Sequence, residues 1–172
     1  AWFHCFAGIA GDMALGALLD AGAPLDEVTG LLDRLPLSGW ALDAEPVLRG
    51  GIAGTQVHVR AEDSTVVRTA AHIQGLVLEA RLPDRVQARA LAVFGALAEA
   101  EGRLHRRPPD QVHFHEVGGI DAIVDVVGTC AALEVLGVHE VRCSPVAVGL
   151  GMVRSAHGII PNPAPAVVEL LR

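Results

Sequence analysis

The segment 120–136 constrains the fold more than any other part of this chain, because it is apolar almost all round. A helix with such a composition is normally buried in a protein core. Its narrow polar stripe contains Asp121 and Asp125, which are four residues apart and so lie on one helix face, with Gly128 and Thr129 beside them. Burying two unpaired carboxylates costs free energy. The segment therefore predicts a central helix whose polar stripe faces a cation, a partner residue or a wet cleft. Gly128 leaves room there for a close approach.

The residues just before this helix add imidazoles to the two carboxylates. His113 and His115 are two residues apart, so in an extended segment they point to the same side, and Glu116 follows them. Imidazoles and carboxylates together suit Mn, Ni, Zn or Fe, whereas carboxylates alone suit Mg or Mn. The alternative is structural: Asp121 would cap the helix and Asp125 would pair with an arginine.

The N-terminal stretch predicts a second candidate site. Residues 1–6 are expected to form a short buried strand, and a glycine turn then leads into a helix that ends near residue 21. A strand, a glycine turn and a helix start together favour anion binding. Gly8 and Gly11 would permit close backbone approach, and Asp12 would cap the helix or hold a metal on a phosphate. The same residues are equally consistent with turn chemistry alone.

Composition narrows the classes of function. The chain has 172 residues, enough for one domain, and its net charge of −7 with 3 % aromatic residues argues against nucleic-acid binding. All 13 basic residues are arginine, so a phosphate must be held by backbone amides, arginine or a metal. No apolar run approaches the roughly 18 residues that a membrane helix needs. Three cysteines without a Cys-x-x-Cys motif indicate the reducing cytoplasm.

The remaining periodicity predicts an α/β fold, with a small mixed sheet flanked by helices in a single domain. Further helices are expected over 24–34, 67–80 and 85–104, and a last one ends at Arg172. Strands are expected over 40–45 and 51–60, joined as a hairpin through Arg49-Gly-Gly51, and over 140–148. His157 precedes Gly158 in a predicted tight turn, and loop histidines are often functional.

Several motifs that occur in order along the chain resemble the LarC family. They are Cys5-Phe-Ala-Gly-Ile-Ala-Gly-Asp-Met13, Val112-His-Phe-His-Glu-Val-Gly-Gly-Ile-Asp-Ala-Ile-Val-Asp125, Ala156-His-Gly158 and Pro161-Asn-Pro-Ala-Pro165, with Ala98-Glu-Ala-Glu101 matching as well. The resemblance covers the whole chain, and independent motifs in order are more specific than any one of them. Members of the family continue beyond the segment that corresponds to the last predicted helix of this chain. We therefore expect residues 1–172 to be a LarC N-terminal-like domain without the C-terminal region.

LarC proteins are nickel insertases, and the resemblance implies this activity for the chain. They place nickel into pyridinium-3,5-bisthiocarboxylic acid mononucleotide, completing the nickel-pincer cofactor of lactate racemase and similar enzymes. The reaction consumes CTP and needs Mn²⁺ or Mg²⁺. By this resemblance, a phosphate of the nucleotide or mononucleotide would bind at Gly8, Gly11 and Asp12. Nickel or the other cation would bind among His113, His115, Glu116, Asp121 and Asp125.

A pincer complex also needs a carbon–metal bond, so a ring C–H must lose its proton. A neutral histidine, His115 or His157, is the expected catalytic base. The apo form of the enzyme that receives the cofactor and further copies of this chain are the candidate protein partners.

Two other functions fit the same residues. The first is a non-catalytic nickel carrier, whose metal binding would not respond to CTP. The second is a metal-dependent hydrolase, since His-x-His on a strand with later His and Asp is typical of metal-dependent amidohydrolases. The usual barrel for that chemistry needs about 250 residues, more than this chain has.

Overall fold

The computed structural model describes residues 1–61, 67–114 and 118–172. Its helices are α1 (Gly11–Asp20), α2 (Leu25–Leu32), α3 (Ala70–Glu79), α4 (Asp84–His105), α5 (Ile120–Val135) and α6 (Pro165–Leu170), with a 3-10 turn η1 (Pro109–Gln111). Its strands are β1 (Trp2–Phe3), β2 (Trp40–Arg49), β3 (Ile52–Ala61), β4 (Arg68–Thr69), β5 (His113–Phe114), β6 (Arg142–Cys143), β7 (Met152–Ser155) and β8 (Gly158–Pro161).

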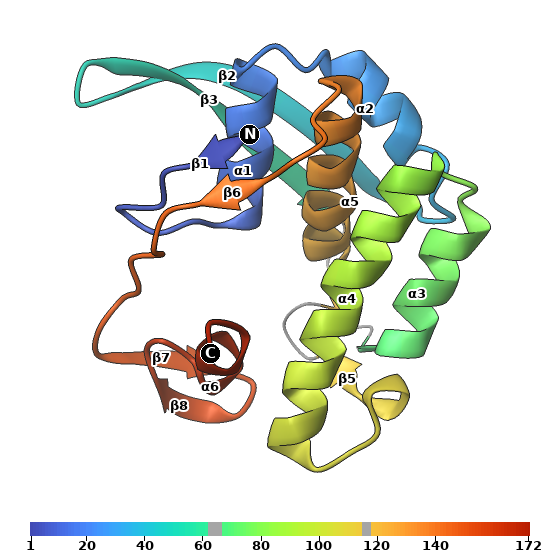
Figure 1. Ribbon diagram of the computed structural model, residues 1–172, viewed down its shortest axis with the longest axis vertical. Helices are drawn as coiled ribbons and strands as arrows, with labels where there is room; N and C mark the ends of the chain where they lie inside the picture. The colour runs from blue at the N-terminus through green and yellow to red at the C-terminus, as the bar shows by residue number, and fades with distance from the viewer. Residues whose placement is uncertain (62–66, 115–117) are drawn as a thin grey trace.

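Helix α5 is the centre of the core, as its composition predicts. It contacts α1, α2, α4 and β3, and Figure 1 shows it standing between α1 and α4. Val124 and Val127 are fully buried. Gly128 does leave room for a close approach, but the neighbour is apolar: a Cβ on Gly128 would lie 3.0 Å from Cδ2 of Leu15 on α1. This glycine therefore brings two helices together.

The hairpin expected between residues 40 and 60 is confirmed. Strands β2 and β3 pair antiparallel, and Arg49 faces Ile52 across a two-residue turn. Gly50 and Gly51 have φ values of +59° and +83°, which is the backbone of a type I′ turn. Helix α1 packs closely against β3 at Gly16. A Cβ at this position would lie only 2.6 Å from a backbone oxygen of that strand, so the absence of a side chain permits the approach.

The α/β class is confirmed, and parallel and antiparallel pairing both occur. The described strands are distributed over four two-stranded sheets, however: β1–β6 is parallel, whereas β2–β3, β4–β5 and β7–β8 are antiparallel. Several of these strands are only two residues long. The buried helix α5, and not a continuous sheet, therefore organises the core.

Two predicted strands are shorter than expected. Within residues 1–6 only Trp2–Phe3 pairs as a strand, and within residues 140–148 only β6 does. The prediction that residues 1–6 are buried is wrong for Trp2 and Phe6, which are 64 % and 73 % exposed. The physical reason for Trp2 is that β1 has one neighbouring strand in the described part of the chain, so its outward side chain stays uncovered. Phe6 lies beyond the end of β1, in the turn that leads to α1.

The chain around residue 68 also differs from the expected helix. Residues 68–69 form β4, which pairs with β5, and helix α3 begins only at Ala70. The Thr69 hydroxyl accepts a hydrogen bond from the His72 N–H at 3.1 Å, which caps the helix. The β7–β8 hairpin is not expected from the sequence, because its strands are short and lack alternation. Among the described residues, no helix is long and apolar enough to cross a membrane.

Candidate functional site

Three carboxylates interact electrostatically where α1 and α5 begin. Asp12 is in the first turn of α1, and Asp121 and Asp125 are in the first turns of α5. The negative charges of Asp12 and Asp121 both act on Asp125, and the backbone N–H of Asp12 donates a hydrogen bond to the Asp125 carboxylate. The structure therefore unites one residue of the predicted glycine turn with two of the predicted metal ligands. We call these three side chains the carboxylate cluster.

The glycine turn is shaped around this cluster. A Cβ on Gly11 would lie 2.6 Å from Oδ2, 2.7 Å from Cβ and 2.9 Å from Cγ of Asp125. The space that Gly11 leaves open is therefore occupied by a carboxylate of the chain itself. Gly8 adopts φ = +93°, a left-handed conformation that favours glycine.

Asp125 is the most perturbed member of the cluster. Its pKa rises from 3.8 to about 6, first because burial removes water from the carboxylate, and then because Asp12 and Asp121 repel its charge. Its Oδ1 atom is buried and has no hydrogen-bond partner within the described residues, and no arginine there pairs with it. A cation would relieve both the lost hydration and the repulsion.

The same charges oppose direct phosphate binding at this turn. A helix N-terminus offers the equivalent of about half a positive charge. Asp12, Asp121 and Asp125 surround that position with up to three negative charges, so a phosphate would need a bridging cation. Phosphate binding by Gly8, Gly11 and Asp12 therefore remains a prediction that requires a bridging cation.

The described residues do not include a finished metal site. In residues 1–61, 67–114 and 118–172, no group of three or more His, Cys, Asp or Glu side chains is arranged to hold a metal ion. The predicted ligands His115 and Glu116 lie outside the described residues. His113 is on β5, where it pairs with Thr69 and is exposed. The cluster is therefore electrostatically suited to a cation, but it is not a complete coordination sphere within this part of the chain.

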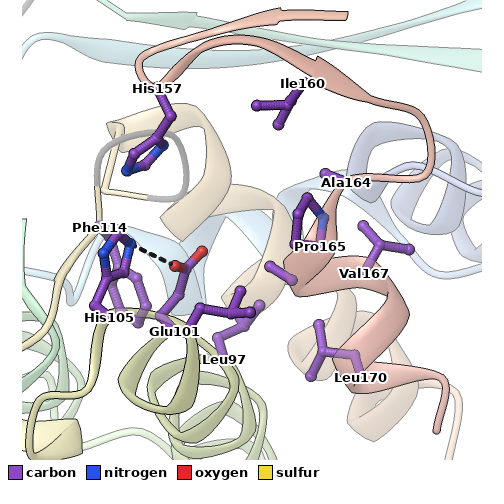
Figure 2. A pocket seen from close by; sticks show the side chains of 12 residues that line it. Leu97, Glu101, His105, Phe114, His157, Ile160, Ala164, Pro165, Val167 and Leu170 are labelled. Carbon is purple, nitrogen blue, oxygen red and sulfur yellow. Dashed lines mark ion pairs between the residues drawn. The ribbon is translucent and has the colours of Figure 1, made fainter. Parts of the chain in front are cut away.

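His157 lies at a different place, in a pocket between α4, β8 and α6. The pocket has a volume of about 380 Å³. Its walls are mainly apolar, and they include Leu97, Leu104, Phe114, Ile160, Pro165, Val167 and Leu170. Figure 2 shows its polar side chains gathered at one end, with His157 pointing from the hairpin toward the end of α4. As predicted, His157 is in a tight turn, between Ser155 and Gly158 of the β7–β8 hairpin.

Two residues at this polar end, Glu101 and His105, are not among the site residues predicted from the sequence. Glu101 and His105 are four residues apart on α4 and form an ion pair, with Oε2 and Nε2 3.3 Å apart. The ring centroids of His105 and His157 are 5.1 Å apart. The i,i+4 spacing of an acid and a histidine could have indicated the pair. Its closeness to His157 depends on tertiary structure and leaves no local signal.

His105 also borders a second, smaller cavity of about 260 Å³. Arg107, Val112 and His113 complete its lining. The structure therefore brings His113 beside a cavity that it shares with His105, and His105 in turn lies beside His157.

The stretch from β5 to α5 links the pocket to the carboxylate cluster. Phe114 lines the pocket, and Asp121 begins the cluster a few residues later. Arg68 donates a hydrogen bond from Nη1 to the Gly118 oxygen at 2.8 Å. A Cβ on Gly118 would overlap the Phe114 oxygen, so only glycine permits this approach. Phe114 and Gly118 are thus both held against β4.

The fold and the carboxylate cluster define an α/β protein with three interacting acidic side chains where α1 and α5 begin. The model of the family described as nickel insertion protein matches residues 1–172. Proteins of Synechococcus elongatus and Roseiflexus castenholzii, whose names assign them to nickel insertion, are 51 % and 49 % identical to the chain. A protein of Desulfitobacterium hafniense, named pyridinium-3,5-bisthiocarboxylic acid mononucleotide nickel insertion protein, is 44 % identical. The chain belongs to the nickel insertion protein family, which confirms the resemblance to LarC.

These alignments cover the chain and its relatives unequally. Each includes 99 % of this chain, but only 43 %, 43 % and 42 % of the Synechococcus, Roseiflexus and Desulfitobacterium proteins. The chain thus spans less than half the length of the relatives that it matches. No solved structure matches it significantly.

Proposed function

We propose that this chain is the cation-binding domain of an enzyme that inserts nickel into pyridinium-3,5-bisthiocarboxylic acid mononucleotide. Membership of the nickel insertion family and the name of the Desulfitobacterium relative support this substrate. The observation that carries the proposal is the carboxylate cluster: Asp125 is desolvated, repelled by Asp12 and Asp121, and has a buried oxygen without a hydrogen-bond partner in the described part. A divalent cation satisfies all three conditions.

The chemistry assigns nickel the role of a substrate. Two thiocarboxylate sulfurs and the ring carbon between them become bound to nickel. The ring C–H bond breaks, its electron pair forms the carbon–nickel bond, and a base accepts the proton. His157 is the proposed base, because it is an imidazole at the polar end of a pocket with apolar walls. His115, the other predicted base, lies outside the described residues.

We further propose that the reaction depends on CTP and on Mn²⁺ or Mg²⁺. A resident cation would neutralise charge on the CTP phosphates. The carboxylates of Asp12, Asp121 and Asp125 are the ligand type that both ions prefer, and the orphaned oxygen of Asp125 is compatible with such an ion. A phosphate could then approach the acidic turn. The recipient of the finished cofactor would be an enzyme of the lactate racemase type, and the reaction would take place in the cytoplasm.

Calorimetric titration tests the nucleotide part of this proposal. CTP is added to the metal-free chain with and without Mn²⁺, and ATP serves as the control. Mn²⁺-dependent binding that favours CTP over ATP supports a nucleotide site in this domain. Absence of CTP binding under both conditions refutes a nucleotide site made by this chain alone.

A second experiment separates an insertase from a nickel carrier. The chain is incubated with Ni²⁺, the sulfur-containing mononucleotide, CTP and Mn²⁺, and the nickel complex is detected by mass spectrometry. Asp12→Asn and Asp125→Asn should each reduce product and nickel binding together. Nickel that binds tightly to the wild type, is unaffected by CTP and never reaches the mononucleotide would instead indicate a carrier.

A further inference from the structure

Two cavities of different character meet at His105. The pocket of about 380 Å³ between α4 and α6 has mainly apolar walls, and the cavity of about 260 Å³ beside it contains Arg107 and His113. His105 lines both. An apolar cavity beside a basic one, with His105 in the wall of each, matches a ligand that has a ring at one end and an anion at the other.

The apolar chamber suits a flat ring. Phe114, Ile160 and Val167 contribute to its walls, and Figure 2 shows the side chains of Ile160 and Val167 at the end away from His105. Glu101 and the two histidines lie at the opposite end. The carboxylate of Glu101 would also offer a negative charge to a cationic ring, such as a pyridinium.

The basic chamber suits a phosphate. The chain has no lysine, so an arginine is the expected phosphate ligand, and Arg107 is the arginine that lines this cavity. Its backbone N–H donates to the Gly102 oxygen at 2.9 Å, which fixes the main chain just after α4. Arg107 forms no ion pair with any residue in the described ranges. His113 and His105 supply further imidazole donors.

We propose that the pyridinium mononucleotide binds across these two cavities, with its ring in the apolar pocket and its phosphate at Arg107 and His113. The alternative seat, the glycine turn beside Asp12, is acidic and disfavours a phosphate without a cation. The assignment also brings the ring to the pocket that contains His157. It rests on the proposed function, because that function supplies the ligand.

Nicotinic acid mononucleotide is the probe, since it combines a pyridinium carboxylate with a ribose phosphate. Its affinity for the metal-free chain is measured by calorimetry beside that of N-methylnicotinate, which lacks the ribose phosphate. Arg107→Gln should weaken mononucleotide binding about ten- to hundredfold, the effect of losing a charge-assisted hydrogen bond. It should leave N-methylnicotinate binding unchanged. Val167→Phe, which fills the apolar pocket from an exposed position, should weaken binding of both ligands.

Arg106→Gln is the matched control. Arg106 is the neighbouring residue and carries the same charge, but it lines neither of the two cavities. The proposal is overturned if Arg106→Gln and Arg107→Gln weaken mononucleotide binding equally, because the attraction would then be diffuse. It is also overturned if wild type binds no mononucleotide, or if Val167→Phe binds both ligands as wild type does.

The outcome can be separated from that of the proposed function. Nickel insertion that proceeds normally in Arg107→Gln would refute this binding site for the mononucleotide but would not contradict the proposed function. Mononucleotide binding that responds to the variants as expected, in a chain that never transfers nickel, would refute the function and leave the seat standing.

Discussion

Asp125→Asn should stabilise the metal-free protein while it damages cation binding. The amide keeps the shape of the carboxylate and an oxygen that can accept from the Asp12 N–H, but it carries no charge to be desolvated or repelled. Asp125 in the folded protein has a pKa of about 6 instead of 3.8, so its contribution favours folding below pH 3.8 and is lost as the pH rises through 6. Above pH 7 the ionised side chain is therefore a net cost.

The size of this cost follows from the shift. A shift from 3.8 to about 6 corresponds to about 3 kcal/mol at roughly 1.4 kcal/mol per pKa unit. Asp125 is only half-buried, so solvent screening reduces this to about 1–2 kcal/mol. For a chain of this size, such a change raises the Tm by about 2–8 °C.

The assay is urea unfolding of wild type and Asp125→Asn in EDTA at pH 4 and pH 8. The free energy of unfolding should be about 1–2 kcal/mol higher for the variant at pH 8, and nearly equal for the two proteins at pH 4. Exposed Asp110→Asn controls for the change in net charge and should show no such pH dependence. The same Asp125 variant should bind Ni²⁺ more than about tenfold more weakly than wild type. A variant that is less stable than wild type at pH 8 would refute the electrostatic reasoning.

Four further outcomes are expected. Nickel affinity should fall as the pH drops below about 6, because protons compete for Asp125, and a flat profile between pH 5 and 8 would count against this residue as a ligand. Gly16→Ala should lower the free energy of unfolding by about 1–3 kcal/mol, because its Cβ would meet a backbone oxygen of Thr55 at 2.6 Å. Unchanged stability in urea would contradict that packing. Thr69→Ala should cost about 1 kcal/mol through loss of the α3 cap and Thr69→Ser much less, and equal losses in thermal melts would assign the effect to the methyl group. His157→Ala should slow nickel insertion without changing nickel affinity, and an equal loss of both would point to a binding role instead.

Those parts of the architecture that depend on local sequence signals could be predicted. The all-round apolar composition of α5 predicts its burial, and Gly50-Gly51 predicts the hairpin turn, because each signal lies within a few residues. The two-residue strands β1, β4, β5 and β6 are too short to show any periodicity. Their pairing depends on partners that are distant in the sequence.

The candidate site divides in the same way. Asp121 and Asp125 could be placed on one helix face from their spacing. The approach of Asp12 to Asp125 depends on α1 packing against α5, and the approach of His105 to His157 depends on α4 and the β7–β8 hairpin. No local pattern encodes those contacts. The role of Gly11 is the clearest example, because the sequence predicts space for a phosphate and the structure fills it with Asp125.

The pairing of β1 with β6 has a consequence for how the protein forms in the cell. The Cys5 N–H donates to the Ser144 hydroxyl across 139 residues of sequence. At a translation rate of about 5–20 residues per second, strand β1 waits roughly 7–28 s on the ribosome before its partner is made. The backbone N–H and C=O groups of Trp2 and Phe3, which pair with β6 in the folded protein, have no strand partner throughout that interval. A molecular chaperone that binds unpaired strand edges would thus have a defined time window in which to hold this strand.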